Sequence, residues 1–277
     1  AMKLPLWLKV SRPRFWIYLL GPFLIGCAIL YRQTGIVPWQ LWPWLLYFTY
    51  PANIFIYGFN DCFDYDTDVL NAKKQGYETL VPPDRRNLIG ILIAISHAPF
   101  FFLIPWLPTL PTAIIIGFFF LGLFYSSPPL RFKIRPFFDS LSNILYALPG
   151  LFAYALGGGT LWSPDLLLAA GLWCIAMHAY SAAPDIEADT KAGLQTIATK
   201  LGWKRTVLLC LFFYAAAALL VIPHSPLFGL VAGIAYVFMM AKSYKGGEAK
   251  LTENYKRFPA INTLLGMLLF FVAAFWR

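Results

Sequence analysis

Acidic residues are the side chains of this sequence best suited to chemistry, and they are gathered in two places. The chain has 13 Asp and Glu residues, and nine of them lie in the segments 60–84 and 185–189. In the first segment, Asp61, Asp64 and Asp68 are spaced i, i+3 and i+7, so a helix would align three carboxylates on one face. Such a row of oxygen atoms indicates a cation site.

The second segment repeats this arrangement with Asp185 and Asp189, an i, i+4 pair. Aligned carboxylates repel each other, so a bound cation is expected to neutralise them. Oxygen ligands without His or Cys pairs at ligand spacing favour a hard cation, which predicts Mg²⁺, with Mn²⁺ as an alternative. The predicted metal ligands are Asp61, Asp64, Asp68, Asp185 and Asp189.

The elements that must position these acids are membrane helices, which makes the fold class all-α and polytopic. Hydrophobic residues make up 59% of the 277 residues and charged residues 13%, compared with roughly 25% charged residues in a soluble domain. Apolar runs near the length that crosses a bilayer predict nine spans in a single domain covering residues 1–277. The predicted spans are 14–30, 40–59, 88–107, 109–125, 138–157, 164–182, 205–222, 226–241 and 258–276.

The basic residues indicate how these spans are oriented. With the N-terminus inside, 20 of the 22 Lys and Arg residues fall on the inner side, and only Arg32 and Arg277 fall outside. This bias predicts that the N-terminus and the active site are cytoplasmic. Because no segment resembles a transit peptide, a prokaryotic plasma membrane is expected. It also explains the net charge of +9 without a nucleic-acid partner.

Both acidic segments lie on that inner side, together with basic residues that could complete a phosphate site. Mg²⁺ usually binds through one or two carboxylates plus substrate phosphates. The predicted diphosphate-binding residues are Asn60, Arg12, Lys74, Arg131 and Lys133. Asn60 could instead ligate the metal. Acids, bases and membrane boundary together predict a site for a lipid diphosphate.

Several of these residues also have simpler structural interpretations. The first acidic segment could be a solvated face, and the positive-inside bias alone accounts for most basic residues. Glu187 and Asp84 are expected to be solvated or to lie just outside the metal ligands, and His178 is expected to be a core histidine. Asp139 and Asn143, at the start of the predicted fifth span, could face the cavity or cap a helix.

Three motifs together resemble the UbiA superfamily of intramembrane prenyltransferases over essentially the whole chain. They are Asn60-Asp61-x-x-Asp64-x-x-x-Asp68, Asp185-x-x-x-Asp189, and Tyr125-Ser126-x-Pro128 continuing through Arg131 and Lys133. The resemblance implies nine helices around a central cavity open to lipid, with both Asp motifs binding Mg²⁺ and an isoprenyl diphosphate under a cytoplasmic cap.

Within this superfamily, the segments 11–16, 50–53, 71–74 and 178–187 are similar to the lycopene elongase branch. That branch adds dimethylallyl units to the ends of lycopene, which leads to C50 carotenoids. The resemblance therefore implies dimethylallyl diphosphate as donor and lycopene as acceptor. Alanine at Asp64 or Asp185, the predicted catalytic acids, is expected to abolish turnover.

Other functions were considered on the same residues. An aromatic quinone precursor or a chlorophyll-type alcohol could be the acceptor in the same chemistry. A transporter with an acidic membrane site belongs to another class, but transporters often bind their substrates near the membrane midplane. The acids here are predicted at one membrane face, which favours the enzyme.

Overall fold

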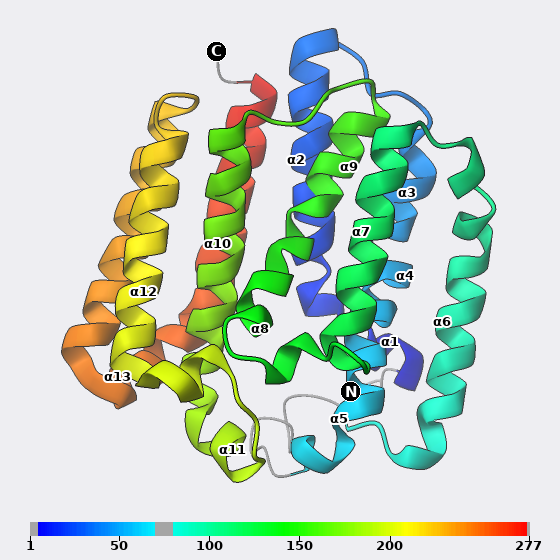
Figure 1. Cartoon of the computed structure of the whole chain (residues 1–277). Helices are drawn as coiled ribbons and strands as arrows, with labels where there is room; N and C mark the ends of the chain where they lie inside the picture. The colour runs from blue at the N-terminus through cyan, green and yellow to red at the C-terminus, as the bar shows by residue number, and fades with distance from the viewer. Residues whose placement is uncertain (1–4, 70–79, 276–277) are drawn as a thin grey trace. The chain divides into compact units, whose positions relative to one another are not determined.

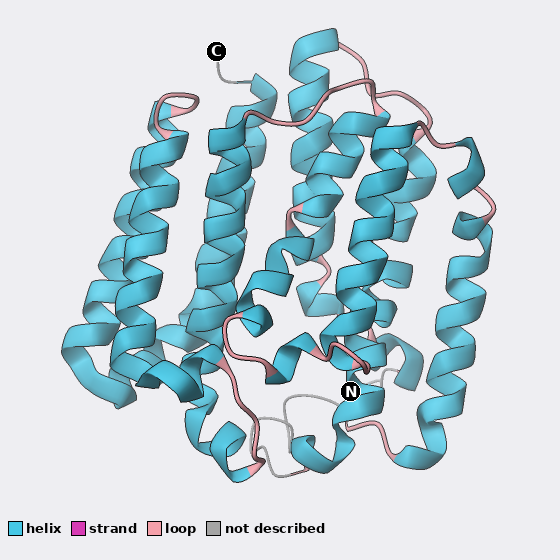
Figure 2. Cartoon of the chain, in the orientation of Figure 1, coloured by secondary structure: helices cyan, strands magenta, loops and turns pink. Residues whose placement is uncertain are grey.

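The chain is entirely helical wherever its structure is described. The computed structural model describes residues 5–69 and 80–275, without the side chains of 66–68, and it contains helices joined by short loops and no strand within these ranges (Figures 1 and 2). It divides into two compact units. Unit 1 comprises Ala1–Arg131 and Leu148–Thr160, and unit 2 comprises Phe132–Ala147 and Leu161–Arg277. Whether these units form one domain, as the sequence predicts, stays a prediction.

Unit 1 contains the first acidic motif and the helices that surround it. Its elements are α1 (Leu6–Val10), η1 (Pro13–Phe15), α2 (Ile17–Thr34), α3 (Leu41–Tyr47), α4 (Tyr50–Asn53), η2 (Ile54–Gly58), α5 (Phe59–Asp68), η3 (Pro83–Arg85), α6 (Arg86–Phe101), η4 (Ile104–Trp106), α7 (Thr109–Ser126) and α9 (Leu148–Leu156). The boundary predicted between the spans 88–107 and 109–125 is confirmed, because η4 ends at Trp106 and α7 begins at Thr109.

The core of unit 1 is built on close packing of α2 against α9 and on aromatic rings. A Cβ added at Gly26 of α2 would lie 2.2 Å from the carbonyl oxygen of Gly150 in α9, so the two backbones touch where glycine has no side chain. The buried rings of Trp44 and Phe152 meet edge to face, with centroids 4.6 Å apart. These contacts fix α2, α3 and α9 against one another within unit 1.

The segment leading to the first acidic motif is broken rather than continuous. After α3 the backbone leaves the helical conformation at Thr49, and Pro51 lies in the first turn of α4, where a missing amide hydrogen is tolerated. Five π-helical residues, Ile54–Gly58, follow and run directly into α5. Short π-helical insertions are frequent at functional sites because they redirect the side chains that follow.

Unit 2 contains the second acidic motif. Its elements are η5 (Phe132–Ile134), α8 (Phe138–Leu141), η6 (Ser142–Tyr146), α10 (Pro164–Ala182), η7 (Ala183–Asp185), α11 (Ile186–Lys191), α12 (Ile197–Val221) and α13 (Pro226–Phe275). Helix α12 packs against both α10 and α13. Helix α10 is in turn joined to α13, since Trp173 Nε1 donates to the Tyr236 hydroxyl (3.0 Å), and that hydroxyl donates to Asn262 Oδ1 within α13 (2.8 Å).

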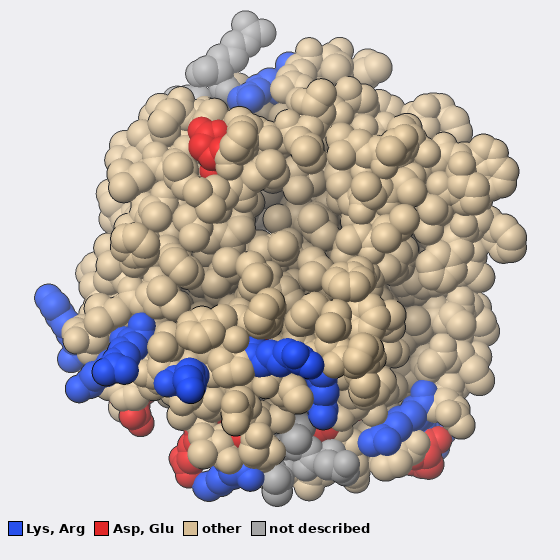
Figure 3. All heavy atoms as spheres, in the orientation of Figure 1, with Lys and Arg blue, Asp and Glu red and all other residues tan. Residues whose placement is uncertain are grey.

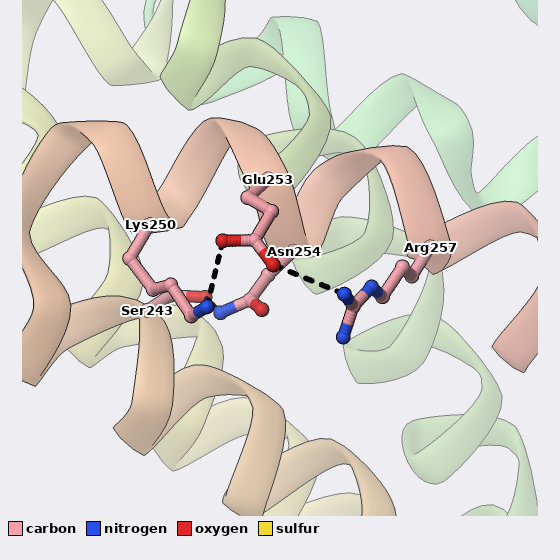
Figure 4. A network of polar contacts seen from close by, with 5 residues as sticks. All are labelled: Ser243, Lys250, Glu253, Asn254 and Arg257. Atoms are coloured by element: carbon pink, nitrogen blue, oxygen red, sulfur yellow. Dashed lines mark hydrogen bonds and ion pairs between the residues drawn. The ribbon is translucent and has the colours of Figure 1, made fainter.

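Helix α13 is bent at Gly247, which adopts a positive φ of 75° that glycine tolerates. A straight helix of its 50 residues would be about 75 Å long, more than twice the thickness of a bilayer core. Beside the bend, Asn254 Nδ2 donates to Ser243 Oγ at 2.9 Å (Figure 4). Glu253 meanwhile accepts from Lys250 at 2.6 Å and from Arg257 at 3.0 Å (Figure 4).

Within the described residues, six elements are long and apolar enough to cross a membrane. They are Ile17–Thr34, Pro83–Trp106, Thr109–Ser126, Pro164–Lys191, Ile197–Val221 and Pro226–Phe275. The predicted count of nine is therefore not confirmed. The predicted spans 40–59 and 138–157 are divided into short helices, while the spans 226–241 and 258–276 both fall inside α13. The ring around a central cavity stays a prediction.

The surface of the protein suits a lipid environment. Large apolar side chains are strongly exposed, among them Trp106 at 79%, Phe102 at 73% and Phe212 at 65%. Most of the face seen in Figure 3 is uncharged. Exposed apolar area of this extent would aggregate in water, so the chain is a multi-pass membrane protein.

Candidate active site

The first acidic motif lies on α5, whose helical conformation produces the predicted alignment. Asp61 is 2% exposed and Asp64 is 9% exposed, so both carboxylates are withdrawn from solvent. The opposite side of the helix is fixed by apolar packing, since Cys62 packs against the buried cluster of Val10, Val81 and Ile89. The protein thus holds two acids at buried positions, which costs free energy unless cations or hydrogen bonds compensate it.

Arg12 supplies part of this compensation. Its Nη2 lies 2.6 Å from Asp61 Oδ1, and its guanidinium stands 5.0 Å from the ring centroid of Tyr57, in the π-helical turn before α5. Arg12 adopts a left-handed backbone with φ 51°, which is uncommon for a residue with a Cβ. Strain of this kind persists only where surrounding structure enforces it, and it gathers at functional sites.

Asn60 is held by the end of another helix. Ser126, the last residue of α7, donates its hydroxyl hydrogen to Asn60 Oδ1 at 2.5 Å. This bond joins the first acidic motif to the segment that precedes the basic loop. Ser126 belongs to one of the three motifs, but its spacing does not predict this bond, and no sequence signal predicts the contact between Tyr57 and Arg12.

The electrostatic surroundings also affect Cys62, which lies between the two buried acids in sequence. Burial, followed by the negative charge of Asp61, raises the pKa of the Cys62 thiol to about 11. The thiol is therefore protonated at neutral pH, which makes it a poor nucleophile there.

The basic loop contains two cations close together in sequence, Arg131 and Lys133. Arg131 has a positive φ of 43°, and its amide donates to the Ser127 carbonyl at 3.0 Å. The Arg131 Nε is buried without a hydrogen-bond partner among the described residues. Lys133 is only 8% exposed. A buried guanidinium nitrogen of this kind calls for an acceptor, and an anionic ligand could supply one.

The structure does not describe the side chains of two predicted site residues. Lys74 lies outside the described residues, and the side chain of Asp68 is likewise not described, although its backbone completes α5. Their roles stay predictions.

In unit 2, the second acidic motif lies at a junction rather than within one uniform helix. Asp185 ends η7 and directly precedes α11, and Asp189 lies one turn further on. Both are half-buried. The carbonyl of Asp189 accepts from the Leu194 amide at 2.8 Å, which closes the turn after α11. The two acids of the i, i+4 pair therefore lie in different elements, Asp185 in a 3₁₀ turn and Asp189 in the α-helix that follows.

The side chain of Asp189 meets the start of α12. Thr196 donates its hydroxyl hydrogen to Asp189 Oδ2 at 3.4 Å, and it is also the N-cap of α12, in a capping box with Thr199. The next amide, that of Ile197, donates to Asp139 Oδ2 at 2.8 Å. Of the two roles considered for Asp139, the structure supports helix capping, although the helix is α12 and not its own.

Residues expected to be solvated are so. Glu187 is exposed and pairs with Lys191 at 2.6 Å, and Asp84 is exposed next to Arg85 at 3.6 Å. His178 is half-buried, and its Nδ1 lies 3.1 Å from Ser140 Oγ, as expected of a structural histidine.

The donor chemistry fits a hard divalent cation, because the acidic motifs offer oxygen atoms and no thiolate or imidazole ligand at matching spacing. Across residues 5–69 and 80–275, apart from the side chains of 66–68, no group of three His, Cys, Asp or Glu side chains converges on one point. The buried acids Asp61 and Asp64 supply oxygen ligands, and phosphate oxygens commonly complete a Mg²⁺ shell. The residues present therefore fit Mg²⁺ bound with a diphosphate.

Comparison with known proteins agrees with this chemistry. The family model for UbiA prenyltransferases matches residues 19–253. A lycopene elongase/hydratase of Haloarcula japonica is 39% identical over 97% of this chain and 90% of its own length. One from Corynebacterium glutamicum is 32% identical over 96% of both chains.

The fold has solved counterparts as well. A UbiA homologue from Archaeoglobus fulgidus, bound to GPP and Mg²⁺, superposes with a TM-score of 0.71 at 21% identity. The match covers 95% of this chain and 99% of that one. At this level of identity the likeness shows the fold.

Proposed function

Because this chain belongs to the UbiA prenyltransferase family, we propose that it transfers dimethylallyl groups from dimethylallyl diphosphate to the ends of lycopene. The enzyme class follows from the family. The donor and acceptor are supported by one observation above others, the similarity at 32–39% identity to lycopene elongase/hydratases over 96–97% of the chain. A match over nearly the whole chain spans both acidic motifs and the basic loop, which supports a shared chemistry.

The proposed metal site uses the two acidic motifs. Its ligands are Asp61, Asp64, Asp68, Asp185 and Asp189, with Mg²⁺ as the cation and Mn²⁺ as a functional substitute. Related folds from Archaeoglobus fulgidus bound to GPP or DMAPP with Mg²⁺ support this choice. When bound, the metal supplies charge neutralisation and Lewis acidity at the leaving diphosphate.

The chain's own cations would act on the same leaving group. Asn60, Arg12, Lys74, Arg131 and Lys133 are proposed to contact the diphosphate. Two observations support this role: the buried Nε of Arg131 has no hydrogen-bond partner among the residues that the structure describes, and Arg12 lies beside Asp61. As the donor C–O bond breaks, its electron pair leaves with the diphosphate, and fixed guanidinium and ammonium groups stabilise the charge that develops there.

The remaining steps involve the hydrocarbon part of the reactants. The terminal alkene of the acceptor attacks the allylic cation, which forms a C–C bond and leaves a tertiary cation. That cation can lose a proton, cyclise and then lose a proton, or take up water and then lose a proton. Apolar surroundings keep bulk water from capturing the first cation. The name elongase/hydratase of the relatives favours addition of water to the tertiary cation.

An aromatic quinone precursor or a chlorophyll-type alcohol is the alternative acceptor. The names of the relatives favour lycopene over both. The family is one of enzymes, which excludes the transporter alternative.

We also propose that the N-terminus and both acidic motifs face the cytoplasm. The placement of 20 of 22 basic residues on one predicted side supports this topology. Reporter fusions after residue 69 and after residue 107 would test it. Cytoplasmic activity at the first and external activity at the second are expected, and the reverse pattern would refute it.

The experiment that tests the function is product analysis in a lycopene-producing bacterium. Pigments heavier by one or two C5 units, with or without added water, are expected from the wild-type chain. Asp64→Asn and Asp185→Asn should leave lycopene unchanged, while the matched exposed variant Glu187→Gln should retain activity. Unchanged lycopene with correctly folded wild-type protein would overturn the choice of acceptor, and aromatic acceptors would then be assayed.

A further inference from the structure

Three segments of unit 2 meet at the first turn of α12. The helix begins with Thr196 as N-cap, and side chains accept from two of its first amides, those of Ile197 and Thr199. One of these side chains, Asp139, comes from α8 at a distance of 58 residues in sequence. On the other side of the same turn, Thr196 reaches Asp189 of the second acidic motif.

Asp139 is placed rigidly. It is 0% exposed, its backbone carbonyl accepts from Asn143 Nδ2 at 2.6 Å, and its backbone amide donates to the Arg135 carbonyl at 3.0 Å. Its Oδ2 accepts the Ile197 amide at 2.8 Å. A carboxylate at a helix N-terminus is favoured by the helix dipole, so this contact fixes where α12 starts.

The Thr196 hydroxyl then transmits that position to Asp189. Its oxygen accepts from the Thr199 amide at 3.3 Å, and its single hydrogen donates to Asp189 Oδ2 at 3.4 Å. Because one hydroxyl both accepts and donates here, the orientation of the hydrogen toward Asp189 is determined by the cap. The Leu194 amide holds the backbone of Asp189 at 2.8 Å from the other side.

We propose that Asp139 and Thr196 are positioning residues for Asp189, and that they act by fixing the first turn of α12 against the second acidic motif. This inference rests on the proposed function, in which Asp189 is a metal ligand. Outer partners that orient a ligating carboxylate typically change metal affinity about 10–100-fold when they are removed. A purely structural cap would instead change only the stability of α12.

Pairs of matched variants separate these two roles. Thr196→Val removes the hydroxyl that reaches Asp189, whereas Thr199→Val removes the reciprocal capping bond and leaves that hydroxyl in place. Asp139→Ala removes the acceptor for the Ile197 amide, whereas Asp139→Asn keeps an acceptor oxygen. Thr196→Ser keeps the hydroxyl and serves as the conservative rescue.

The main measurement is the affinity for Mn²⁺ of the purified full chain in detergent, with inorganic diphosphate present. The electron paramagnetic resonance signal of the free ion reports how much Mn²⁺ is bound. Thr196→Val and Asp139→Ala should weaken Mn²⁺ binding about 10–100-fold. Thr196→Ser and Asp139→Asn should stay close to wild type. Thr199→Val should lower the melting temperature and leave Mn²⁺ binding unchanged. The Mg²⁺ concentration that gives half-maximal turnover should follow the same order.

Equal Mn²⁺ affinity in Thr196→Val, Thr199→Val and wild type would overturn the inference and leave a cap alone. If Asp139→Ala does not fold, the comparison of Thr196→Val with Thr196→Ser still decides. Wild-type protein that binds Mn²⁺ with diphosphate but does not alter lycopene would refute the proposed acceptor and leave this inference standing. Wild-type protein that binds no Mn²⁺ would refute the proposed metal site and, with it, this inference.

Discussion

The buried ion pair between Arg12 and Asp61 gives the sharpest test of the first acidic motif. The pair joins Nη2 and Oδ1 at 2.6 Å, with the side chains 13% and 2% exposed. Arg12→Ala would leave the Asp61 carboxylate buried without this cation. Loss of one partner of a buried pair costs about 3–5 kcal/mol, because the remaining charge loses the cation that lay against it.

The cost is best measured as a change in the free energy of unfolding in mixed micelles, with a chelator present. Arg12→Ala should lower this free energy by about 3–5 kcal/mol, while the double variant Arg12→Ala with Asp61→Asn should lose less, because no uncompensated charge remains. Arg257→Ala at the exposed pair with Glu253 is the matched control and should have little effect. Added Mg²⁺ with diphosphate should restore part of the loss in Arg12→Ala.

Two results would refute this reasoning. One is an Arg12→Ala cost no larger than that of Arg257→Ala, which would mean that water reaches Asp61. The other is strict additivity of the Arg12 and Asp61 variants, which would mean that the two charges do not interact in the folded protein.

Three further outcomes are expected. Ser126→Ala removes the donor to Asn60 and should lower turnover by a factor corresponding to about 0.5–1.5 kcal/mol without changing the melting temperature greatly; an unchanged rate would remove this bond from the site. Gly26→Ala forces a Cβ to within 2.2 Å of the Gly150 carbonyl, so unfolding should become easier by about 1–3 kcal/mol, and wild-type stability would contradict the close approach of the two helices. Since the Cys62 thiol has its pKa raised to about 11, its alkylation, followed by peptide mapping, should be slow at neutral pH and accelerate as pH rises toward that value; fast neutral labelling would contradict its burial.

The sequence by itself determined those features that depend on short-range geometry. The spacing of Asp61 and Asp64 aligns their carboxylates in any helix, and α5 is a helix. Apolar composition likewise required membrane helices, because such surface is unstable in water. The family followed from three local motifs, and the comparison with known proteins confirms it.

Hydropathy could not determine how each apolar stretch is divided. The predicted span 40–59 contains a break at Thr49 and a π-helical turn, and the two last predicted spans belong to α13 with its bend at Gly247. A hydropathy window records the length of an apolar run, whereas these breaks depend on φ and ψ at single residues.

Only the tertiary structure decided which groups accompany the acids. Arg12 meets Asp61 across 49 residues, Ser126 meets Asn60 across 66, and Asp139 meets the start of α12 across 58. No local pattern encodes these pairings, because they arise from the packing of helices distant in sequence. The sequence thus specified the acids and the membrane helices that carry them, while helix packing selected the residues that neutralise and orient those acids.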